Sequence, residues 1–144
     1  KAPAAICRKV IAAKMSGEGT IEIWGNGEQT RSFMYIDDCL HGTQAIMKSA
    51  HITFPINLGS DEKVSINQLV DVVESIAGIQ LKRQYKLDAP KGVNGRNSEN
   101  SLIQKELGWA PSVSLRTGME KTYAWIFDQV KSGNTDGSIY NRTD

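Results

Sequence analysis

The sequence predicts a small mixed α/β domain, and three observations lead to this fold class. Segments with the apolar spacing of helices alternate with short strand-like segments, but they form no regular strand–helix–strand series. A complete doubly wound sheet would need more strands than the sequence offers. A length of 144 residues, 40% of them hydrophobic, suits one compact domain and is too short for two ordinary ones. We expect residues 1–131 to form this domain and residues 132–144 to form a polar, mobile tail.

A helix and two strands are expected first. Residues 2–15 have helical spacing, and Ser16-Gly17-Glu18-Gly19 ends the helix. Residues 20–24 and 29–35 predict two strands, and the turn Gly25-Asn26-Gly27 between them predicts that they pair as a hairpin. The helix would bury Ile6, Val10 and Ala13.

Residues 36–48 predict a second helix, with Asp37 and Asp38 at the positive end of its dipole. This pair of carboxylates is read as a helix start and not as catalytic machinery. The segment Pro55–Leu58 predicts a short buried strand that ends at Gly59-Ser60. The inward face of the helix would carry Ile36, Leu40 and Met47.

The clearest helix covers residues 66–77. Ser65 and Gln68 have the spacing of a capping box, and Gly78 follows the last helical residue. Its apolar stripe consists of Ile66, Leu69, Val70, Val73 and Ile76.

The remaining third of the chain predicts a strand, a loop and two helices. Residues 81–87 alternate as a strand, and residues 89–100 form a polar loop that holds Arg96. A short helix is expected at 101–107 and a longer one at about 116–131. The last helix would bury Met119, Tyr123, Ile126 and Val130.

Composition excludes several classes of function. A net charge of +1 gives no electrostatic case for binding nucleic acid or an anionic membrane. No apolar run approaches the ~20 residues that cross a bilayer. Two cysteines without a CxxC spacing make no disulfide framework, so a cytoplasmic protein with reduced thiols is expected.

The motifs of several enzyme classes are missing. The glycine turn lacks the third glycine of a dinucleotide-binding loop and leads into a strand instead of a helix. No Tyr-x-x-x-Lys pair occurs, and the isolated His41 and His51 form no zinc-binding pattern. We therefore expect no metal site, no bound NAD(P) and no hydride transfer in this chain alone.

The run from Glu22 to Cys39 combines a glycine turn, a cation and an acidic helix start. A planar guanidinium such as that of Arg31 can hold a diphosphate through two parallel hydrogen bonds. The simpler alternatives are a plain hairpin turn and, for Arg31 or Arg96 taken singly, a surface ion pair.

Five motifs, KAPAAICRK, WGNGEQTRSFMYIDDC, NLGSDEKVSIN, GVNGRNSEN and LGWAPSVSLRTGMEKTYAWI, occur in this order and cover nearly the whole chain. They resemble the C-terminal part of the GDP-mannose 3,5-epimerases, which belong to the extended short-chain dehydrogenase/reductase (NAD-dependent epimerase/dehydratase) family. RSFMYIDD, NLGS and LGWAP are shared across that superfamily, whereas KAPAA and GRNSEN are narrower. The resemblance implies a small substrate-binding portion that lacks most of the Rossmann domain, with NAD bound by the full-length parent.

The same resemblance implies roles for particular residues. Lys1 would be one of two groups that shuttle protons at the sugar, and its partner would be an upstream cysteine, which is not Cys7. Asn94 departs from the family, which usually has a second arginine there. The implied substrate-binding residues are Ala2, Lys9, Gln29, Thr30, Arg31 and Arg96, of which Gln29, Thr30, Arg31 and Arg96 would hold the nucleotide diphosphate.

The expected function is recognition of a GDP-mannose-like nucleotide sugar by part of an epimerase. Because the sequence begins at Lys1 without a methionine, we expect a fragment or processed product, although a removed tag would look the same. Lys1 at a terminus would be neither positioned nor desolvated, so activity is not expected from this chain alone. The alternatives are a stand-alone nucleotide-sugar-binding module from a truncated gene, and a relic that dimerises through an apolar face. The expected partner is therefore a second copy or the missing N-terminal Rossmann half.

Overall fold

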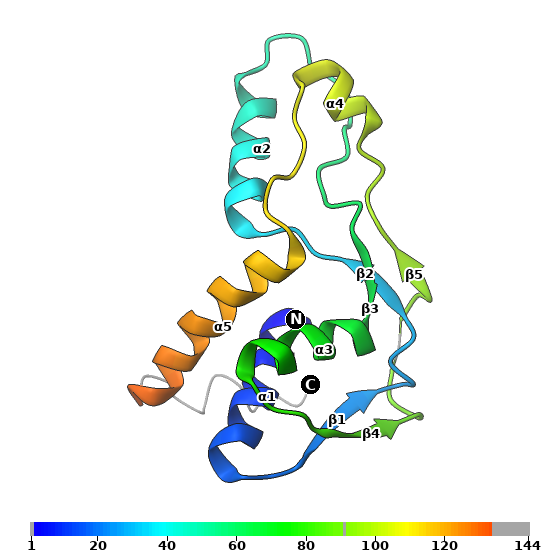
Figure 1. Cartoon of the computed structure of the whole chain (residues 1–144). Helices are drawn as coiled ribbons and strands as arrows, with labels where there is room; N and C mark the ends of the chain where they lie inside the picture. Colours follow the sequence, from blue (N-terminus) through cyan, green and yellow to red (C-terminus); the bar gives the residue numbers. More distant parts are fainter. Residues whose placement is uncertain (1, 91, 134–144) are drawn as a thin grey trace.

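The computed structural model describes residues 2–90 and 92–133, which form five helices and five short strands (Figure 1). The mixed α/β class predicted from the sequence is confirmed. The predicted tail falls almost wholly outside the described residues and stays a prediction. The elements are α1 (Ala2–Ser16), β1 (Thr20–Trp24), β2 (Thr30–Ser32), α2 (Ile36–Lys48), β3 (Lys63–Ser65), α3 (Ile66–Ala77), β4 (Lys82–Lys86), β5 (Gly95–Arg96), α4 (Ser101–Leu107) and α5 (Leu115–Lys131).

The hydrophobic core lies where α1, α3 and α5 pack against one another and against β1. Helix α3 begins as predicted, because the Ser65 hydroxyl accepts a hydrogen bond from the Gln68 backbone and the Gln68 side chain accepts one from the Ser65 backbone. The predicted inward faces of α1, α3 and α5 are confirmed, with Ile66, Ile76 and Val130 only half-buried. The side chains that are completely enclosed in this core are Cys7, Val10, Ile11, Leu69, Val70 and Val73.

The strands form two separate sheets. Strand β1 pairs in parallel with β4, and β2 lies between β3, which is antiparallel to it, and β5, which is parallel. The predicted hairpin is therefore wrong, because β1 and β2 do not pair. The turn between them instead meets the start of α3, where the Asn67 backbone N–H donates to the Gly27 carbonyl at 3.0 Å. Gly27 has a φ of 73°, and a side chain there would collide with Asn67.

The predicted inward face of α2 is also wrong. Ile36, Leu40 and Met47 are 55%, 52% and 80% exposed, whereas Asp38 and Gly42 are buried. The Asp38 side of the helix faces inward because the Asp38 carboxylate accepts hydrogen bonds from the Ser112 and Val113 backbone N–H groups and from the Ser112 hydroxyl, at 2.8–3.0 Å. The exposed residues Ile36, Leu40 and Met47 are called the α2 stripe below.

The strand predicted at Pro55–Leu58 is absent from the described structure. No described strand lies beside this segment to complete a ladder, and its apolar residues Ile56 and Leu58 are only half-buried. In Figure 1 it belongs to the connection from α2 to β3, which passes α4 in the part of the molecule away from the α1–α3–α5 core. Within residues 2–90 and 92–133, no helix has both the length and the apolar character required to cross a membrane.

Candidate functional site

Two arginines that are far apart in the sequence lie side by side in the small three-stranded sheet. Arg31 on β2 is the register partner of Arg96 on β5. Partners in a ladder project from the same face of a sheet, so both side chains reach the same side. Both line a groove of about 390 Å³. The structure thus brings together two of the four residues predicted to hold the nucleotide diphosphate.

The groove has the lining of an anion site. It offers two guanidinium groups and the side-chain amides of Asn57 and Asn97, and none of the described residues that line it carries a carboxylate. Guanidinium and amide N–H groups are the donors that match phosphate oxygens. The groove is lined by Arg31, Ser32, Met34, Asn57, Leu58, Gly59, Ser60, Arg96, Asn97 and Ser98.

The two arginines differ in how they are held. Arg31 is half-buried, and one of its guanidinium nitrogens donates to the Thr30 carbonyl at 2.7 Å. Arg96 is exposed, and no carboxylate within the described ranges forms a salt bridge with it. One cation is therefore fixed against the sheet, and the other faces solvent.

The far wall of the groove is built by two chain segments that touch. The Ser98 backbone N–H donates to the Ser60 carbonyl at 3.3 Å, and the Asn100 amide donates to the Gly59 carbonyl at 2.9 Å. A side chain on Gly59 would lie 2.6 Å from the Ser98 Cβ, so only glycine allows this approach. The residues Asn57–Ser60 and Asn97–Ser98 carry no pattern that predicts a site, and their only signal in the sequence is their position in the motifs NLGS and GRNS.

Gln29 and Thr30, which were predicted to bind the nucleotide diphosphate, do not line the groove. The Gln29 amide donates to the Trp24 carbonyl at 3.0 Å and so fastens the glycine turn. Thr30 is the register partner of Gly95, and its hydroxyl lies over that glycine. Because neighbouring strand residues point to opposite faces, Thr30 is directed away from the Arg31 side.

Lys9, also predicted to contact substrate, lies on the exposed side of α1 and is directed toward β1. Its ammonium donates to the Glu22 carbonyl at 2.9 Å and lies 3.6 Å from the Glu22 carboxylate. A hydrogen bond from the Trp24 indole, together with the charge of Lys9, holds the pKa of Glu22 below its usual value. The structure does not bring Lys9 to the groove.

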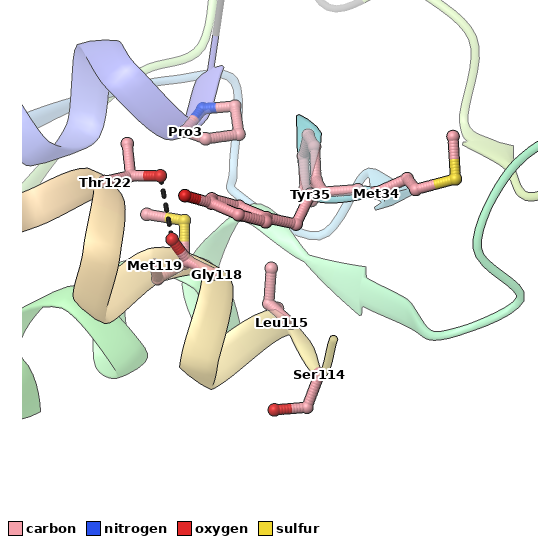
Figure 2. Close-up of a pocket in the computed structure, with 9 residues that line it drawn as sticks. Pro3, Met34, Tyr35, Ser114, Leu115, Gly118, Met119 and Thr122 are labelled. Atoms are coloured by element: carbon pink, nitrogen blue, oxygen red, sulfur yellow. Dashed lines mark hydrogen bonds between the residues drawn. The ribbon is translucent and has the colours of Figure 1, made fainter. Parts of the chain in front are cut away.

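The start of α1 lies beside a second, smaller cavity of about 70 Å³ (Figure 2). Ala2 is half-buried next to Pro3, which lines this cavity, and Lys1 lies outside the described residues. Figure 2 shows the Tyr35 ring directed toward Pro3, whereas the Met34 side chain extends the other way. Met34 lines both this cavity and the groove that holds Arg31 and Arg96, which is called the arginine groove below. The start of α1 and the arginine groove are therefore adjacent at Met34.

Cys7 has no acid/base role in this arrangement. It is completely buried, and burial raises the pKa of its thiol to about 11. A thiol with such a pKa stays protonated at neutral pH and does not exchange protons with a ligand. Among the residues the structure describes, no group of three His, Cys, Asp or Glu side chains is arranged to hold a metal ion.

The glycine turn does not fit a dinucleotide. In a dinucleotide-binding loop, glycines leave space for the pyrophosphate at the N-terminus of the following helix. Here the space at Gly27 is filled by Asn67, and the turn is followed by β2. Gly27 therefore serves packing against α3.

Residues 2–122 match the protein family described as GDP-mannose 4,6 dehydratase. GDP-mannose 3,5-epimerase 1 of Oryza sativa subsp. indica is 42% identical over 137 residues, which are 95% of this chain and 35% of the relative. GDP-mannose 3,5-epimerase of Arabidopsis thaliana is 43% identical over 138 residues, again 35% of its length. The chain thus spans about a third of the curated relatives it matches.

Solved structures agree on the fold. UDP-glucuronic acid 4-epimerase from Bacillus cereus in complex with NAD has 30% identity and a TM-score of 0.69, over 90% of this chain and 40% of that one. RMD from Pseudomonas aeruginosa complexed with NADPH has a TM-score of 0.81 at 14% identity, over 90% of this chain and 43% of that one. The second comparison supports the fold alone. The predicted resemblance to part of an extended short-chain dehydrogenase/reductase is confirmed, and the chain belongs to the GDP-mannose 4,6 dehydratase family.

Proposed function

We propose that this chain is the substrate-recognising part of a cytoplasmic, NAD-dependent nucleotide-sugar epimerase similar to GDP-mannose 3,5-epimerase. In this proposal Arg31 and Arg96 hold the diphosphate of a GDP-mannose-like substrate between them. The observation that carries it is their pairing across β2 and β5, at a groove whose lining, within residues 2–90 and 92–133, includes no carboxylate.

The chemistry of the groove supports a diphosphate over a neutral sugar. A guanidinium can donate two parallel hydrogen bonds to phosphate oxygens, and such charge-assisted bonds are roughly twice as strong as neutral ones. Arg31 and Arg96 both line the groove, and two guanidinium groups attract a dianion more strongly than either does alone. The arrangement therefore suits a ligand with at least two negative charges.

The sugar would extend from the arginine groove past Met34 toward the start of α1. This direction is supported by the two cavities that share Met34, the smaller of which reaches Pro3. Epimerisation needs one group to remove a proton from carbon and another to return it on the opposite face. We assign one of these two roles to Lys1, with Ala2 beside the sugar and with the partner cysteine outside this chain.

NAD is assigned to the full-length parent and not to this chain. The parent's cofactor would supply the oxidation that acidifies the C–H bonds next to the oxidised carbon. The chain alone would bind the nucleotide sugar without converting it. The described structure does not direct Lys9, Gln29 or Thr30 into the groove. In this proposal these three residues contact the substrate outside the groove.

Calorimetric titration with GDP-mannose, GDP and mannose tests the proposal. Binding of GDP-mannose and GDP, but not of mannose, is expected, because the diphosphate carries the recognition. No heat with millimolar GDP-mannose would contradict the proposal.

A second candidate is an interaction module, and the α2 stripe is the observation that favours it. Ile36, Leu40 and Met47 lie on one side of α2 and face solvent. Contiguous exposed apolar surface marks association sites. The stripe would bind either a second copy of this chain or the N-terminal Rossmann half of the parent.

A further inference from the structure

Asn100 stands immediately before α4, but its side chain does not cap that helix. Asparagine is among the preferred capping residues, so another role for the side chain needs an explanation. The Ser101 backbone N–H at the helix start donates instead to the Glu99 carboxylate at 2.8 Å. The Asn100 amide donates to the Gly59 carbonyl at 2.9 Å, and its oxygen accepts from the Ser98 hydroxyl at 2.7 Å.

These two bonds close the far wall of the arginine groove. Gly59 and Ser98 both line the groove and are in contact with each other. The same two segments are joined by the Ser98 N–H to the Ser60 carbonyl and by the Asn57 amide to the Glu99 carbonyl at 3.2 Å. Asn100 is the residue in this network whose side chain bonds to both segments.

The network matters most for Arg96. Strand β5 has only two residues, so the ladder with β2 fixes Arg96 through a single register partner, Arg31. After Arg96 the chain leaves the sheet, and Asn97 and Ser98 continue along the groove. The next side-chain anchor beyond Arg96 is the contact between Ser98 and Asn100.

We propose that Asn100 is a positioning residue for anion binding, and this inference rests on the proposed function. Through its bonds to Ser98 and Gly59, it keeps the segment that carries Arg96 beside Arg31. Without Asn100, that segment would move away from the wall, and the two guanidinium groups would no longer meet the same diphosphate.

The test is calorimetric titration of the full 144-residue chain with GDP. Asn100→Ala is expected to weaken GDP binding about tenfold, the size typical of coupled neighbouring residues. In an Arg96→Ala background the same change is expected to have no further effect. Ser98→Ala is the second variant, in case Asn100→Ala fails to fold, and Gln104→Ala, an exposed position on α4, is the matched control. Hydrogen exchange at the Ser98 amide, measured without ligand, should become faster in Asn100→Ala.

The possible results separate this inference from the proposed function. Equal GDP affinity of Asn100→Ala and the unaltered chain would overturn this inference and leave the proposed function standing. So would a weakening that persists fully in the Arg96→Ala background, since Asn100 would then act on the fold and not through Arg96. If the unaltered chain binds no GDP, the proposed function fails and this inference fails with it.

Discussion

Arg31 and Arg96 show how a site can depend on register. The two residues meet because the Thr30 and Arg31 backbones of β2 align with Gly95 and Arg96 of β5. A shift by one residue would move one guanidinium to the opposite face. From the sequence, only the resemblance to a known family predicts that each arginine contacts phosphate. That the two arginines lie side by side depends on the pairing of two segments that are far apart in the sequence.

Replacing either arginine tests this pairing at the residue scale. Arg31→Ala and Arg96→Ala should each weaken binding of GDP-mannose by about tenfold or more, since a hydrogen bond to a charged group contributes roughly 1.5–3 kcal/mol. Calorimetry measures the effect. Arg116→Ala is the control, because Arg116 is exposed on α5 and pairs with Glu120 at 3.1 Å. If the control weakens binding as much as the two variants do, the groove is not the site.

Gly27 gives a second prediction at this scale, for stability. Its φ of 73° is unfavourable for other residues, and a Cβ would collide with Asn67. Gly27→Ala should therefore lower the free energy of unfolding by about 1–3 kcal/mol. Denaturant unfolding measures this, with Gly19→Ala as control, since a Cβ at Gly19 meets open space. Equal loss in both variants would mean that the turn does not pack on α3 as described.

At the scale of elements, Asp38 is what fixes α2 to the segment before α5. Burial alone would raise the pKa of its carboxyl, but the hydrogen bonds from Val113 and Ser112 together outweigh burial and lower the pKa. Asp38→Asn should cost about 1–3 kcal/mol of unfolding free energy, because an amide cannot accept all three bonds. Asp37→Asn is the matched control, since Asp37 is exposed.

The pH dependence of this contact has a definite sign. A carboxyl whose folded pKa is lowered contributes stability above its unfolded pKa of about 3.9, and this contribution is lost as the pH falls through the folded pKa. The stability gap between the unaltered chain and Asp38→Asn should therefore be full near pH 7 and should narrow below about pH 4. Urea unfolding at several pH values measures the gap, and a gap that stays constant down to pH 2 would contradict this account.

Local signals predicted elements well, and long-range contacts account for the errors. The capping box of Ser65 and Gln68 is decided within one turn of helix, so α3 was predictable. The glycine turn wrongly predicts a hairpin, because its bond to Asn67 comes from a segment about forty residues later and leaves no local signal. The buried side of α2 was missed because the partner of Asp38 lies more than seventy residues away.

On the scale of the whole molecule, the chain corresponds to about a third of the length of its curated relatives. Apolar side chains are exposed on the α2 side. The α2 stripe and the unpaired segment Pro55–Leu58 lie in the same part of the fold, away from the α1–α3–α5 core (Figure 1). Helices and extended segments of an α/β protein normally bury such faces against a sheet. The sequence could not predict this exposure, because the pattern of α2 is that of a buried helix.

This exposed surface predicts concentration-dependent association. Sedimentation velocity should show dimers or larger species at tens of micromolar, and Leu40→Glu on the stripe should shift the population toward monomer. Lys48→Glu, at the exposed end of the same helix, is the control for added charge. A chain that remains monomeric at all concentrations would exclude the second copy as the partner of the stripe.

A crystal structure of the chain with GDP bound tests the central claim most directly. The account predicts diphosphate oxygens within about 3 Å of the guanidinium groups of both Arg31 and Arg96, in the groove they share. A diphosphate bound elsewhere on the chain, or held by only one of the two arginines, would contradict it.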